Sequence, residues 1–334
     1  MSTIASILLA PISALISVAL YIRHRLYDAY ILRSSDVQVP TVCVGNLALG
    51  GPGKTPHVEY LIRQLAPRYR IAVLSRGYGR RTKGFRLVTP TDTAYTSGDE
   101  PLQIATKFPA IPVAVCENRV KGVRQLLKLY PDLQLVILDD AFQHRAIRCD
   151  FYILLTAYDN LYVKDRVWPL GHLRDLRSRS HKADVIIVTK CPANMQPIDK
   201  RILETTLHKA SFQQLYFSAY QYAPLPAEGT PLLVTGIANP QPHYDYVLAQ
   251  RPNAELLAFP DHHDFMPPEV ELIKSRAASF DYVLTTEKDL PRLQAAGLAQ
   301  ALGDRLFALP IEVTILDEGD QLIKKIATYI NKLC

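Results

Sequence analysis

The sequence is poor in cysteine and contains no Cys-x-x-Cys pair. Five cysteines are scattered over 334 residues, and no two of them have the spacing of a zinc site or a disulfide framework. An odd number of isolated thiols is typical of a protein from a reducing compartment. The five are Cys43, Cys116, Cys149, Cys191 and Cys334.

Internal repeats and low-complexity tracts are absent as well. Hydrophobic residues make up 48% of the chain and charged residues 21%, which excludes a disordered protein and indicates a well-packed globular one. A length of 334 residues exceeds that of a usual single domain, so two lobes are expected. The formal net charge of +6 suits a nucleotide, a phospholipid or a nucleic acid and does not choose among them.

Charged residues are missing altogether from Ile4–Ile22, which consists mainly of Ile, Leu, Val and Ala. The stretch is just long enough for a bilayer span, which takes about 20 apolar residues. Its three serines and Pro11 favour a helix that lies on the membrane surface or inserts shallowly; a true span and a buried core helix are the alternatives. In a spanning chain, the following Arg23–Arg25 would keep the remainder cytoplasmic. We therefore expect residues 1–25 to form a membrane-associated helix.

After this helix, short apolar runs alternate with helical stretches, which predicts an α/β fold with a mostly parallel sheet and helices on both faces. The first set comprises strands at Val39–Val44, Ile71–Leu74, Val113–Cys116, Leu135–Leu138, Phe151–Leu155 and Val185–Val188, and helices at Pro56–Leu65 and Val120–Leu129. The strand rhythm breaks near residue 205, which places one domain at 26–205 and a smaller α/β C-terminal lobe at 206–334. The second set comprises strands at Gln214–Ala219, Leu232–Thr235, Glu255–Ala258, Tyr282–Thr285 and Leu306–Leu309, and helices at Pro267–Ser279 and Asp320–Lys332.

The strongest motif runs from Gly45 to Thr55, between a predicted strand and a predicted helix. In that setting it indicates a P-loop, whose glycines let backbone N–H groups surround phosphate oxygens at a helix N-terminus. Lys54 would reach the β- and γ-phosphates of ATP, and the Thr55 hydroxyl would bind Mg²⁺. Ala48 departs from the strict pattern, which has glycine there. The predicted ATP-binding residues of the loop are Asn46, Gly50, Gly51, Gly53, Lys54 and Thr55.

A second nucleotide element is Leu135–Asp140, a run of apolar β-formers that ends in two acids. It predicts that Asp139 and Asp140 hold the metal at the carboxyl edge of the sheet. Many buried strands end in an acid, so this element alone is weak evidence for a nucleotide site. Together with the P-loop it is strong evidence.

Two classes of P-loop protein fit the sequence poorly. A GTPase would carry Asn-Lys-x-Asp, and its nearest counterpart, Thr189–Pro192, lacks both the Asn and the Asp. A partition-type membrane ATPase would carry lysine where Leu49 stands. The residues thus indicate a P-loop NTPase-like fold, and they leave open both a kinase and a membrane-associated switch ATPase that phosphorylates nothing.

The glycine-broken stretch Arg76–Arg86 holds five cations. It is either a solvated basic loop or a contact for a substrate phosphate or anionic lipid headgroups, where each cation adds about 1 kcal/mol. Nucleic-acid binding could use the same charges, but no recognition helix or aromatic stacking pattern accompanies them. Arg76 and Arg80 are the candidate substrate contacts.

Taken in order, the motifs resemble those of the tetraacyldisaccharide 4′-kinase family, the inner-membrane enzymes of lipid A biosynthesis. The resemblance covers residues 4 to about 290, and two positions depart from it. Ala48 replaces a Thr or Ser, and Asp175 stands where Glu is more common. The matching blocks are Gly45–Pro56, Ser75–Arg80, Gly98–Pro101, Asp139–His144, Pro169–Asp175, Phe259–His262 and Thr286–Asp289.

The resemblance implies an ATP- and Mg²⁺-dependent kinase that phosphorylates the 4′-hydroxyl of tetraacyldisaccharide 1-phosphate, an acylated diglucosamine lipid, to form lipid IVA. It places the enzyme on membrane lipids at the cytoplasmic face of the inner membrane of a Gram-negative bacterium. Neither a nucleic-acid partner nor an obligate protein partner is expected.

The resemblance also assigns roles to single residues. Asp99 would be the general base and His262 its partner. Metal binding at His262 is the rival idea, and it lacks a third ligand at a plausible spacing. The remaining assignments are Arg119 with Lys54 on the phosphates, Asp175 as a further metal ligand, and Gln143, His144 and Arg174 on the sugar or its phosphate.

Overall fold

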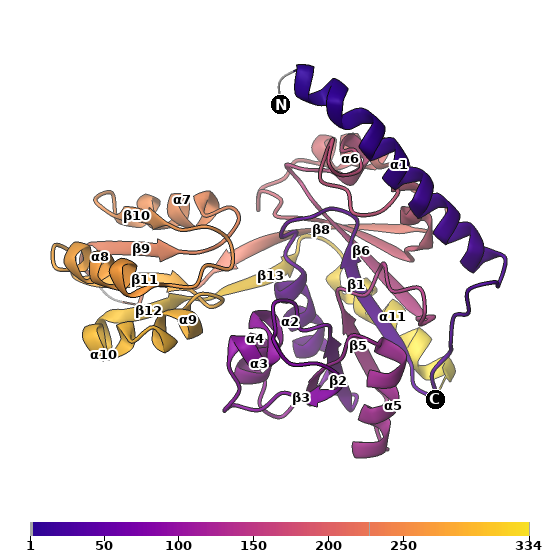
Figure 1. Cartoon of the computed structure of the whole chain (residues 1–334), viewed down its shortest axis with the longest axis horizontal. Coiled ribbons are helices and arrows are strands. Elements are labelled where there is room, and N and C mark those ends of the chain that lie inside the picture. Colours follow the sequence, from indigo (N-terminus) through magenta and orange to yellow (C-terminus); the bar gives the residue numbers. More distant parts are fainter. Residues whose placement is uncertain (1–2, 227, 334) are drawn as a thin grey trace.

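Two sheets organise the chain, one of nine strands and one of four (Figure 1). The computed structural model describes residues 3–226 and 228–333. The first two residues of the expected N-terminal helix and Cys334 lie outside the described part.

The nine-stranded sheet has the order β13-β8-β7-β6-β1-β5-β2-β4-β3. All of its ladders are parallel except the two at its edges, β13 with β8 and β3 with β4. Its central strands are buried on both faces, which explains why they read as continuous apolar runs. The bounds are β1 Thr41–Asn46, β2 Ile71–Ser75, β3 Arg86–Leu87, β4 Val113–Val115, β5 Leu135–Asp139, β6 Phe151–Ala157, β7 Val185–Thr189, β8 Gln214–Tyr222 and β13 Ile311–Ile315.

Helices cover both faces of this sheet. One face packs against α2 (Lys54–Leu65), α4 (Asp99–Lys107) and α11 (Gly319–Leu333). The opposite face packs against α5 (Arg119–Leu129), α6 (Pro197–Leu207) and part of α1 (Thr3–Asp28). Short elements join them, namely α3 Ala94–Ser97, η1 Tyr162–Lys164 and η2 Arg177–Lys182. The predicted P-loop NTPase-like architecture is confirmed.

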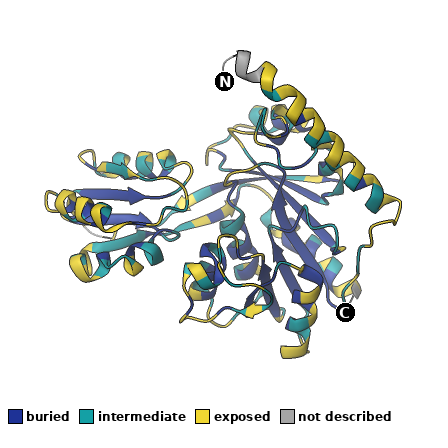
Figure 2. Ribbon diagram, in the orientation of Figure 1, coloured by how far each residue is buried: buried dark blue, intermediate teal, exposed yellow. Residues whose placement is uncertain are grey.

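The smaller lobe is a parallel sheet of order β10-β9-β11-β12. Helices α8, α9 and α10 pack on one face of it and α7 on the other. Figure 2 shows buried strands in each of the two sheets. The bounds are β9 Pro231–Thr235, α7 Gln241–Gln250, β10 Glu255–Ala258, α8 Pro267–Ala277, β11 Tyr282–Thr286, α9 Leu290–Ala295, α10 Leu298–Leu302, η3 Gly303–Arg305 and β12 Leu306–Leu309.

The lobe boundary expected at residue 205 needs correction, because residues 206–334 do not form one separate unit. Strand β8 continues the large sheet, and β13 returns to pair with it in antiparallel fashion. Helix α11 then packs into the core of the nucleotide lobe beside α2. Only the segment from β9 to β12 belongs to the small sheet. Local hydrophobic patterns are alike in both lobes, so they do not reveal which sheet a strand joins.

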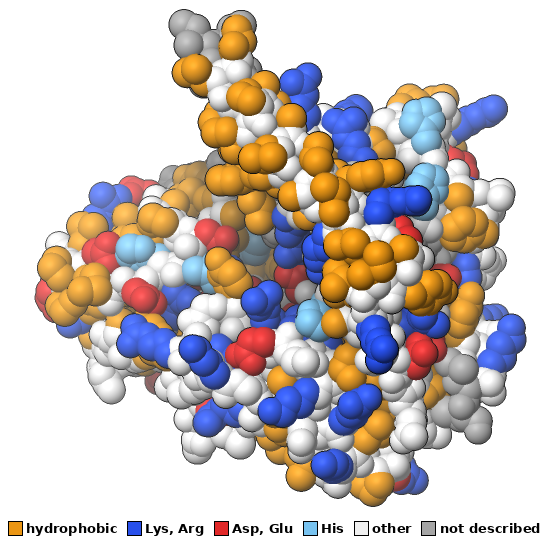
Figure 3. Space-filling model, turned by 45° about the vertical axis from the view of Figure 1, so that its right-hand side comes forward, with side chains coloured by type: hydrophobic (Ala, Val, Ile, Leu, Met, Phe, Trp, Pro, Cys, Tyr) orange, Lys and Arg blue, Asp and Glu red, His pale blue; other side chains and the backbone are white. Residues whose placement is uncertain are grey.

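Helix α1 runs along the outside of the large lobe and leaves much of its apolar surface uncovered (Figures 2 and 3). Its stretch Ile7–Asp28 is long and apolar enough to cross a membrane, and 11% of the most apolar window is buried. The inner side is docked: Ser13 Oγ donates to the carbonyl oxygen of Val167 at 2.7 Å, and Ile16 and Leu20 pack on the core. One side of α1 therefore packs on the protein, and the other exposes apolar side chains.

Candidate active site

The P-loop connects β1 to α2, which begins directly at Lys54. Gly53 precedes the helix with φ of 85°, a left-handed conformation that glycine adopts without strain. A Cβ there would also collide with the Tyr220 hydroxyl. Lys54 Nζ lies 3.4 Å from Asn46 Oδ1 and 3.9 Å from Asp140 Oδ2. The loop thus brings its lysine next to the acids at the end of β5.

Replacing Gly53 with alanine should abolish ATP binding and lower the melting temperature. The left-handed backbone costs on the order of 1–3 kcal/mol for a residue with a side chain, and the Cβ forces Tyr220 away. Gly297→Ala is the matched control, because Gly297 has a similar left-handed φ of 86°, lies outside the P-loop at the start of α10, and a Cβ there meets only the end of the Gln300 side chain. Nucleotide titration and thermal unfolding of both variants test this; equal losses in the two variants would contradict the steric argument.

His57 of α2 connects the P-loop to strand β8. It is 2% exposed, and burial lowers its pKa to about 4. Its Nδ1 lies 2.7 Å from the carbonyl oxygen of Gly53 and its Nε2 lies 2.9 Å from Ser218 Oγ. Because a carbonyl only accepts, Nδ1 carries the proton and Nε2 accepts from the serine. This connection was not anticipated from the sequence.

Asp139 ends β5 and Asp140 follows it, beside Lys54 of the P-loop. Asp139 is 3% exposed, and Ser75 Oγ donates to its Oδ2 at 3.2 Å. Burial and the neighbouring Asp140 raise the pKa of Asp139 to about 6. Burial alone would raise the pKa of Asp140 too, but Arg174 and Lys54 hold it below its ordinary value.

The two acids differ in their suitability for Mg²⁺. Asp139 Oδ1 is buried without a hydrogen-bond partner, so this oxygen could serve as a cation ligand. Both oxygens of Asp140 already accept from Arg174. Within the described residues no group of three or more His, Cys, Asp or Glu could hold a metal. Mg²⁺ usually binds through one or two carboxylates plus substrate phosphates, so Asp139 with the Thr55 hydroxyl fits, and Asp140 needs Arg174 to move.

Arg174 and Gln143 hold the start of the P-loop. The Arg174 guanidinium donates to Asn46 Oδ1 at 2.5 Å, and Gln143 Nε2 donates to the Asn46 carbonyl oxygen at 2.7 Å. Both were expected to bind the sugar or its phosphate. In this conformation both Nη atoms of Arg174 and Nε2 of Gln143 are bonded within the protein, so the two side chains support the nucleotide loop.

Arg119 and His144 also lie deeper than expected. Arg119 is 1% exposed, and its guanidinium donates to the carbonyl oxygens of Cys116 at 3.0 Å and of Asp139 at 3.4 Å. Burial and the charge of Arg119 lower the pKa of His144 to about 4, so it stays neutral. Arg119 therefore stabilises the end of β5 through bonds from inside the lobe. Its contact with a phosphate stays a prediction.

The predicted pair Asp99 and His262 meets across the two lobes. Asp99 opens α4, and His262 follows β10; His262 Nδ1 lies 2.7 Å from Asp99 Oδ2. Arg292 of α9 joins them, donating from Nε to Asp99 Oδ1 at 2.9 Å and from Nη2 to Oδ2 at 2.7 Å. Burial alone would raise the pKa of Asp99, but the bonds from His262 and Arg292 lower it. The sequence offered one clue to Arg292, its position directly after the Thr286–Asp289 block.

Glu100 links this cluster to the phosphate site. Its carboxylate lies 3.8 Å from His262 Nε2, and its charge also raises the pKa of Asp139. Lys288 Nζ lies 3.1 Å from His262 Nε2 and 2.8 Å from Asp261 Oδ1. Glu100 thus connects the Asp99–His262 cluster electrostatically with Asp139 at the end of β5.

The Asp99–His262 pair should stabilise the folded protein most below pH 6.5. Its hydrogen bond raises the pKa of His262 above the ordinary 6.5, so its contribution is complete below that pH and declines as pH rises through the raised pKa. At acid pH the lowered pKa of Asp99 decides the dependence. The contribution of Asp99 to stability is present above its ordinary pKa of 3.8 and is lost as the pH falls through the lowered pKa.

Thermal unfolding of the wild type and of His262→Ala between pH 5 and pH 9 measures this dependence. We expect the difference in melting temperature to shrink toward alkaline pH. A difference that stays constant over the range would show that the protonated imidazole does not join the lobes.

Two expected site residues lie elsewhere. Asp175 is 1% exposed and accepts from His24 Nε2 of α1 at 2.6 Å and from the N–H of Leu176 at 2.8 Å. None of the contacts recorded for it in residues 3–226 and 228–333 involves the P-loop or β5, which argues against metal ligation. The side chain of Arg80 is 2% exposed and is bonded to Glu117 and to the Gly84 carbonyl oxygen. It therefore stabilises the loop that carries it. Arg76 remains exposed.

Comparison with known proteins assigns these features to one family. A family model described as tetraacyldisaccharide-1-P 4′-kinase matches residues 5–331. Tetraacyldisaccharide 4′-kinase of Bacteroides thetaiotaomicron is 39% identical, with 97% of this chain and 93% of the relative covered. The same enzyme of Flavobacterium johnsoniae is 39% identical, with 97% of each covered.

A solved structure is similar over almost the whole chain. It is the "apo" form of LpxK from Aquifex aeolicus in complex with ATP, 28% identical with a TM-score of 0.76. The match covers 98% of this chain and 99% of that one. The two-lobed arrangement is thus shared by a protein that binds ATP.

Proposed function

The chain belongs to the tetraacyldisaccharide-1-phosphate 4′-kinase family, and we propose that Asp99, Lys54 and Asp139 carry its chemistry. The protein is an ATP-dependent kinase of lipid A biosynthesis that phosphorylates the 4′-hydroxyl of a tetraacylated disaccharide lipid. The observation that supports the residue roles most is the contact of Asp99 with His262 and Arg292, one residue from Glu100, whose charge acts on Asp139.

Phosphoryl transfer relies on alignment and charge neutralisation more than on covalent chemistry. Lys54 supplies a cation at the β- and γ-phosphates, and the backbone N–H groups of the loop surround the phosphate oxygens. Mg²⁺, held by Asp139 and the Thr55 hydroxyl, would neutralise the developing charge. Arg174 keeps Asn46 and Asp140 in place around this set.

Asp99 receives the hydroxyl proton. Its lowered pKa keeps it ionised at neutral pH, so it accepts a hydrogen bond from the 4′-hydroxyl and takes the proton as the bond to phosphorus forms. His262 orients the carboxylate from the second lobe and can share the proton. Since acid and histidine come from different lobes, the site is complete only while these lobes are in contact.

The reaction is tested by incubating the purified chain with γ-labelled ATP, Mg²⁺ and tetraacyldisaccharide 1-phosphate in detergent micelles. We expect label in a 4′-phosphorylated lipid. Hydrolysis of ATP without labelled lipid would instead favour the switch ATPase.

We further propose that α1 lies in the membrane surface at the cytoplasmic face of the inner membrane. Ser13 and His24 are buried against the large lobe, so Thr3 to Ile12 are the described residues of α1 that extend beyond the docked part. About ten residues reach roughly 15 Å, half of the roughly 30 Å hydrocarbon core. Their length supports a surface position for a docked α1. Its exposed apolar side chains would enter the interface where the acylated substrate resides.

Leu15→Asp should shift the protein from the membrane fraction to the soluble fraction. Leu15 is 71% exposed on α1, and burying a carboxylate in the interface is unfavourable. Leu272→Asp, an equal change at an exposed leucine of α8, is the matched control. Fractionation of both variants decides; if both stay bound, α1 is not the anchor.

A further inference from the structure

Residues 167–175 form a strap that runs beside the P-loop. The N–H of Leu49 donates to the His172 carbonyl oxygen at 2.6 Å, and the N–H of Arg174 donates to the Leu47 carbonyl oxygen at 2.8 Å. Leu173 between them is fully buried and bridges Ala48. The strap thus adds a short antiparallel ladder to the loop that surrounds the phosphates.

Helix α1 holds the strap at both of its ends. Ser13 Oγ donates to the carbonyl oxygen of Val167, the first strap residue, at 2.7 Å. His24 Nε2 bonds Asp175, the last strap residue, at 2.6 Å. The Arg145 guanidinium lies 3.5 Å from His24 Nδ1 and donates to the His24 carbonyl oxygen at 2.9 Å. Since a guanidinium only donates, Nδ1 accepts and the proton of His24 is on Nε2, aimed at Asp175.

A second path leads from α1 to the same loop. Arg23 Nη2 donates to the Gln143 carbonyl oxygen at 3.0 Å, and Gln143 Nε2 bonds Asn46. Arg174, adjacent to Asp175, also bonds Asn46. Both paths end at the residue where β1 passes into the P-loop.

We propose that α1 is a positioning element for the nucleotide site, in addition to being a membrane contact. His24 acts through Asp175 and the strap, which set the P-loop in the geometry that receives ATP. A helix that leaves the lobe would release both ends of the strap at once. Nucleotide affinity and the docked state of α1 are therefore coupled, and each favours the other.

The test compares His24→Ala and His24→Gln with Leu15→Ser in detergent. His24→Ala should weaken ATP binding on the order of 10- to 10²-fold, as misplacement of a site from a distance does, and should raise the KM for ATP more than it lowers kcat. In His24→Gln the amide can still donate to Asp175, so affinity should recover. Leu15 lies on the exposed side of the same helix, so Leu15→Ser should bind ATP as the wild type does.

The opposite outcomes are equally clear. Wild-type ATP affinity in His24→Ala overturns the proposal. A loss of ATP affinity that His24→Gln does not recover also overturns it, because the bond to Asp175 would then not be the cause. The melting temperatures of both variants show whether the loss comes from a general defect in folding.

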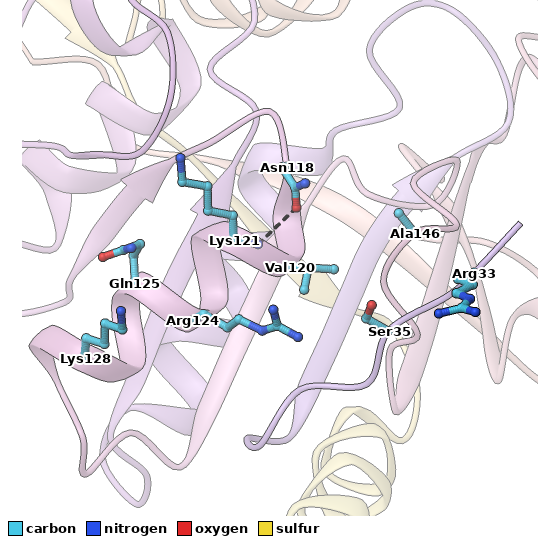
Figure 4. Close-up of a pocket in the computed structure, with 9 residues that line it drawn as sticks. All are labelled: Arg33, Ser35, Asn118, Val120, Lys121, Arg124, Gln125, Lys128 and Ala146. Atoms are coloured by element: carbon cyan, nitrogen blue, oxygen red, sulfur yellow. Dashed lines mark hydrogen bonds between the residues drawn. The ribbon is translucent and has the colours of Figure 1, made fainter.

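A separate hollow lies between α5 and the segment that follows α1, with a volume of ≈ 400 Å³. Figure 4 shows Arg124 reaching from α5 toward the segment that carries Arg33 and Ser35. The lining contains no carboxylate, and its four cations have no ion pair within residues 3–226 and 228–333. Those cations are Arg33, Lys121, Arg124 and Lys128.

Apolar surface adjoins the hollow directly. Tyr30, Ile31 and Leu32, immediately before Arg33, are exposed, and they follow α1 in the chain. Four like charges repel one another unless an anion joins them, and an apolar edge beside such charges suits a molecule with a phosphate and acyl chains. Soluble phosphate would pair with the four cations but would leave the apolar edge uncovered.

We infer that the hollow binds the phosphate of an anionic phospholipid headgroup, with Tyr30–Leu32 against its acyl chains. This inference rests on the membrane contact proposed for α1. Each cation near an anionic surface contributes about 1 kcal/mol, so removing two should weaken binding to anionic vesicles about 30-fold.

The test measures sedimentation of the full chain with phosphatidylglycerol and with phosphatidylcholine vesicles. Arg124→Ala/Lys128→Ala should lose affinity for the first and keep affinity for the second. Lys324→Ala/Lys332→Ala removes the same charge from exposed positions on α11, on the opposite face of the sheet, and should lose less.

Equal losses in the two double variants would show general attraction and overturn the inference. So would release from phosphatidylglycerol vesicles by millimolar inorganic phosphate, which would make soluble phosphate the ligand. A wild type that fails to bind phosphatidylcholine vesicles would instead count against the contact proposed for α1, which keeps the two failures distinguishable.

Discussion

Asp99→Asn should lower kcat by about 10²- to 10⁴-fold, the usual contribution of a positioned acid or base, with little change in ATP affinity. The amide keeps the shape of the side chain, and its oxygen can still accept from His262 and Arg292 Nη2. Its NH2 loses the bond from Arg292 Nε, and it cannot take the hydroxyl proton. The measurement is transfer of label from γ-labelled ATP to the lipid at saturating substrate, alongside a nucleotide titration.

Glu100→Gln is the matched control for this variant. Glu100 is the next residue in the first turn of α4, and its nearest recorded contact with His262 is 3.8 Å. It should retain most of the activity. If Asp99→Asn and Glu100→Gln lose activity equally, the first turn of α4 acts through its total charge and Asp99 is not the base.

Lys54→Met should reduce kcat/KM by about 10²- to 10³-fold, the range seen when one donor to a developing charge is removed. The lysine lies within 3.9 Å of Asp140, where the β- and γ-phosphates are expected. Asp140 keeps its pairing with Arg174, so the variant should fold. Steady-state kinetics with ATP as the varied substrate test this.

Lys324→Met, at an exposed position of α11, controls for the loss of one cation. It should behave as the wild type. Lys54→Met with unchanged kinetics would mean that another cation neutralises the phosphates, and Arg76 would become the first alternative.

Much of the fold was predictable because the central strands are buried on both faces. Leu135–Asp139 and Val185–Thr189 are continuous apolar runs, which local patterning detects. The pairing of β13 with β8 joins residues about ninety positions apart, and no local pattern carries that information. The lobe boundary was misplaced for this reason.

The site shows the same division. The P-loop and the end of β5 were found because a glycine-rich turn and a strand ending in acids have local signatures. Arg292 and His57 were missed, since their roles depend on partners far away in the chain. Asp175 was assigned by its neighbours in a motif, whereas the structure turns it toward α1.

The return of the chain to its first lobe has a consequence for synthesis. Helix α11 fills the core beside α2 with Leu322, Ile326 and Ile330, each at most 1% exposed. The ATP-binding lobe therefore lacks part of its core until the last residues of the chain have left the ribosome. We expect nascent chains that stop after β12 to expose this apolar surface and depend on chaperones, although every residue of the P-loop is already present.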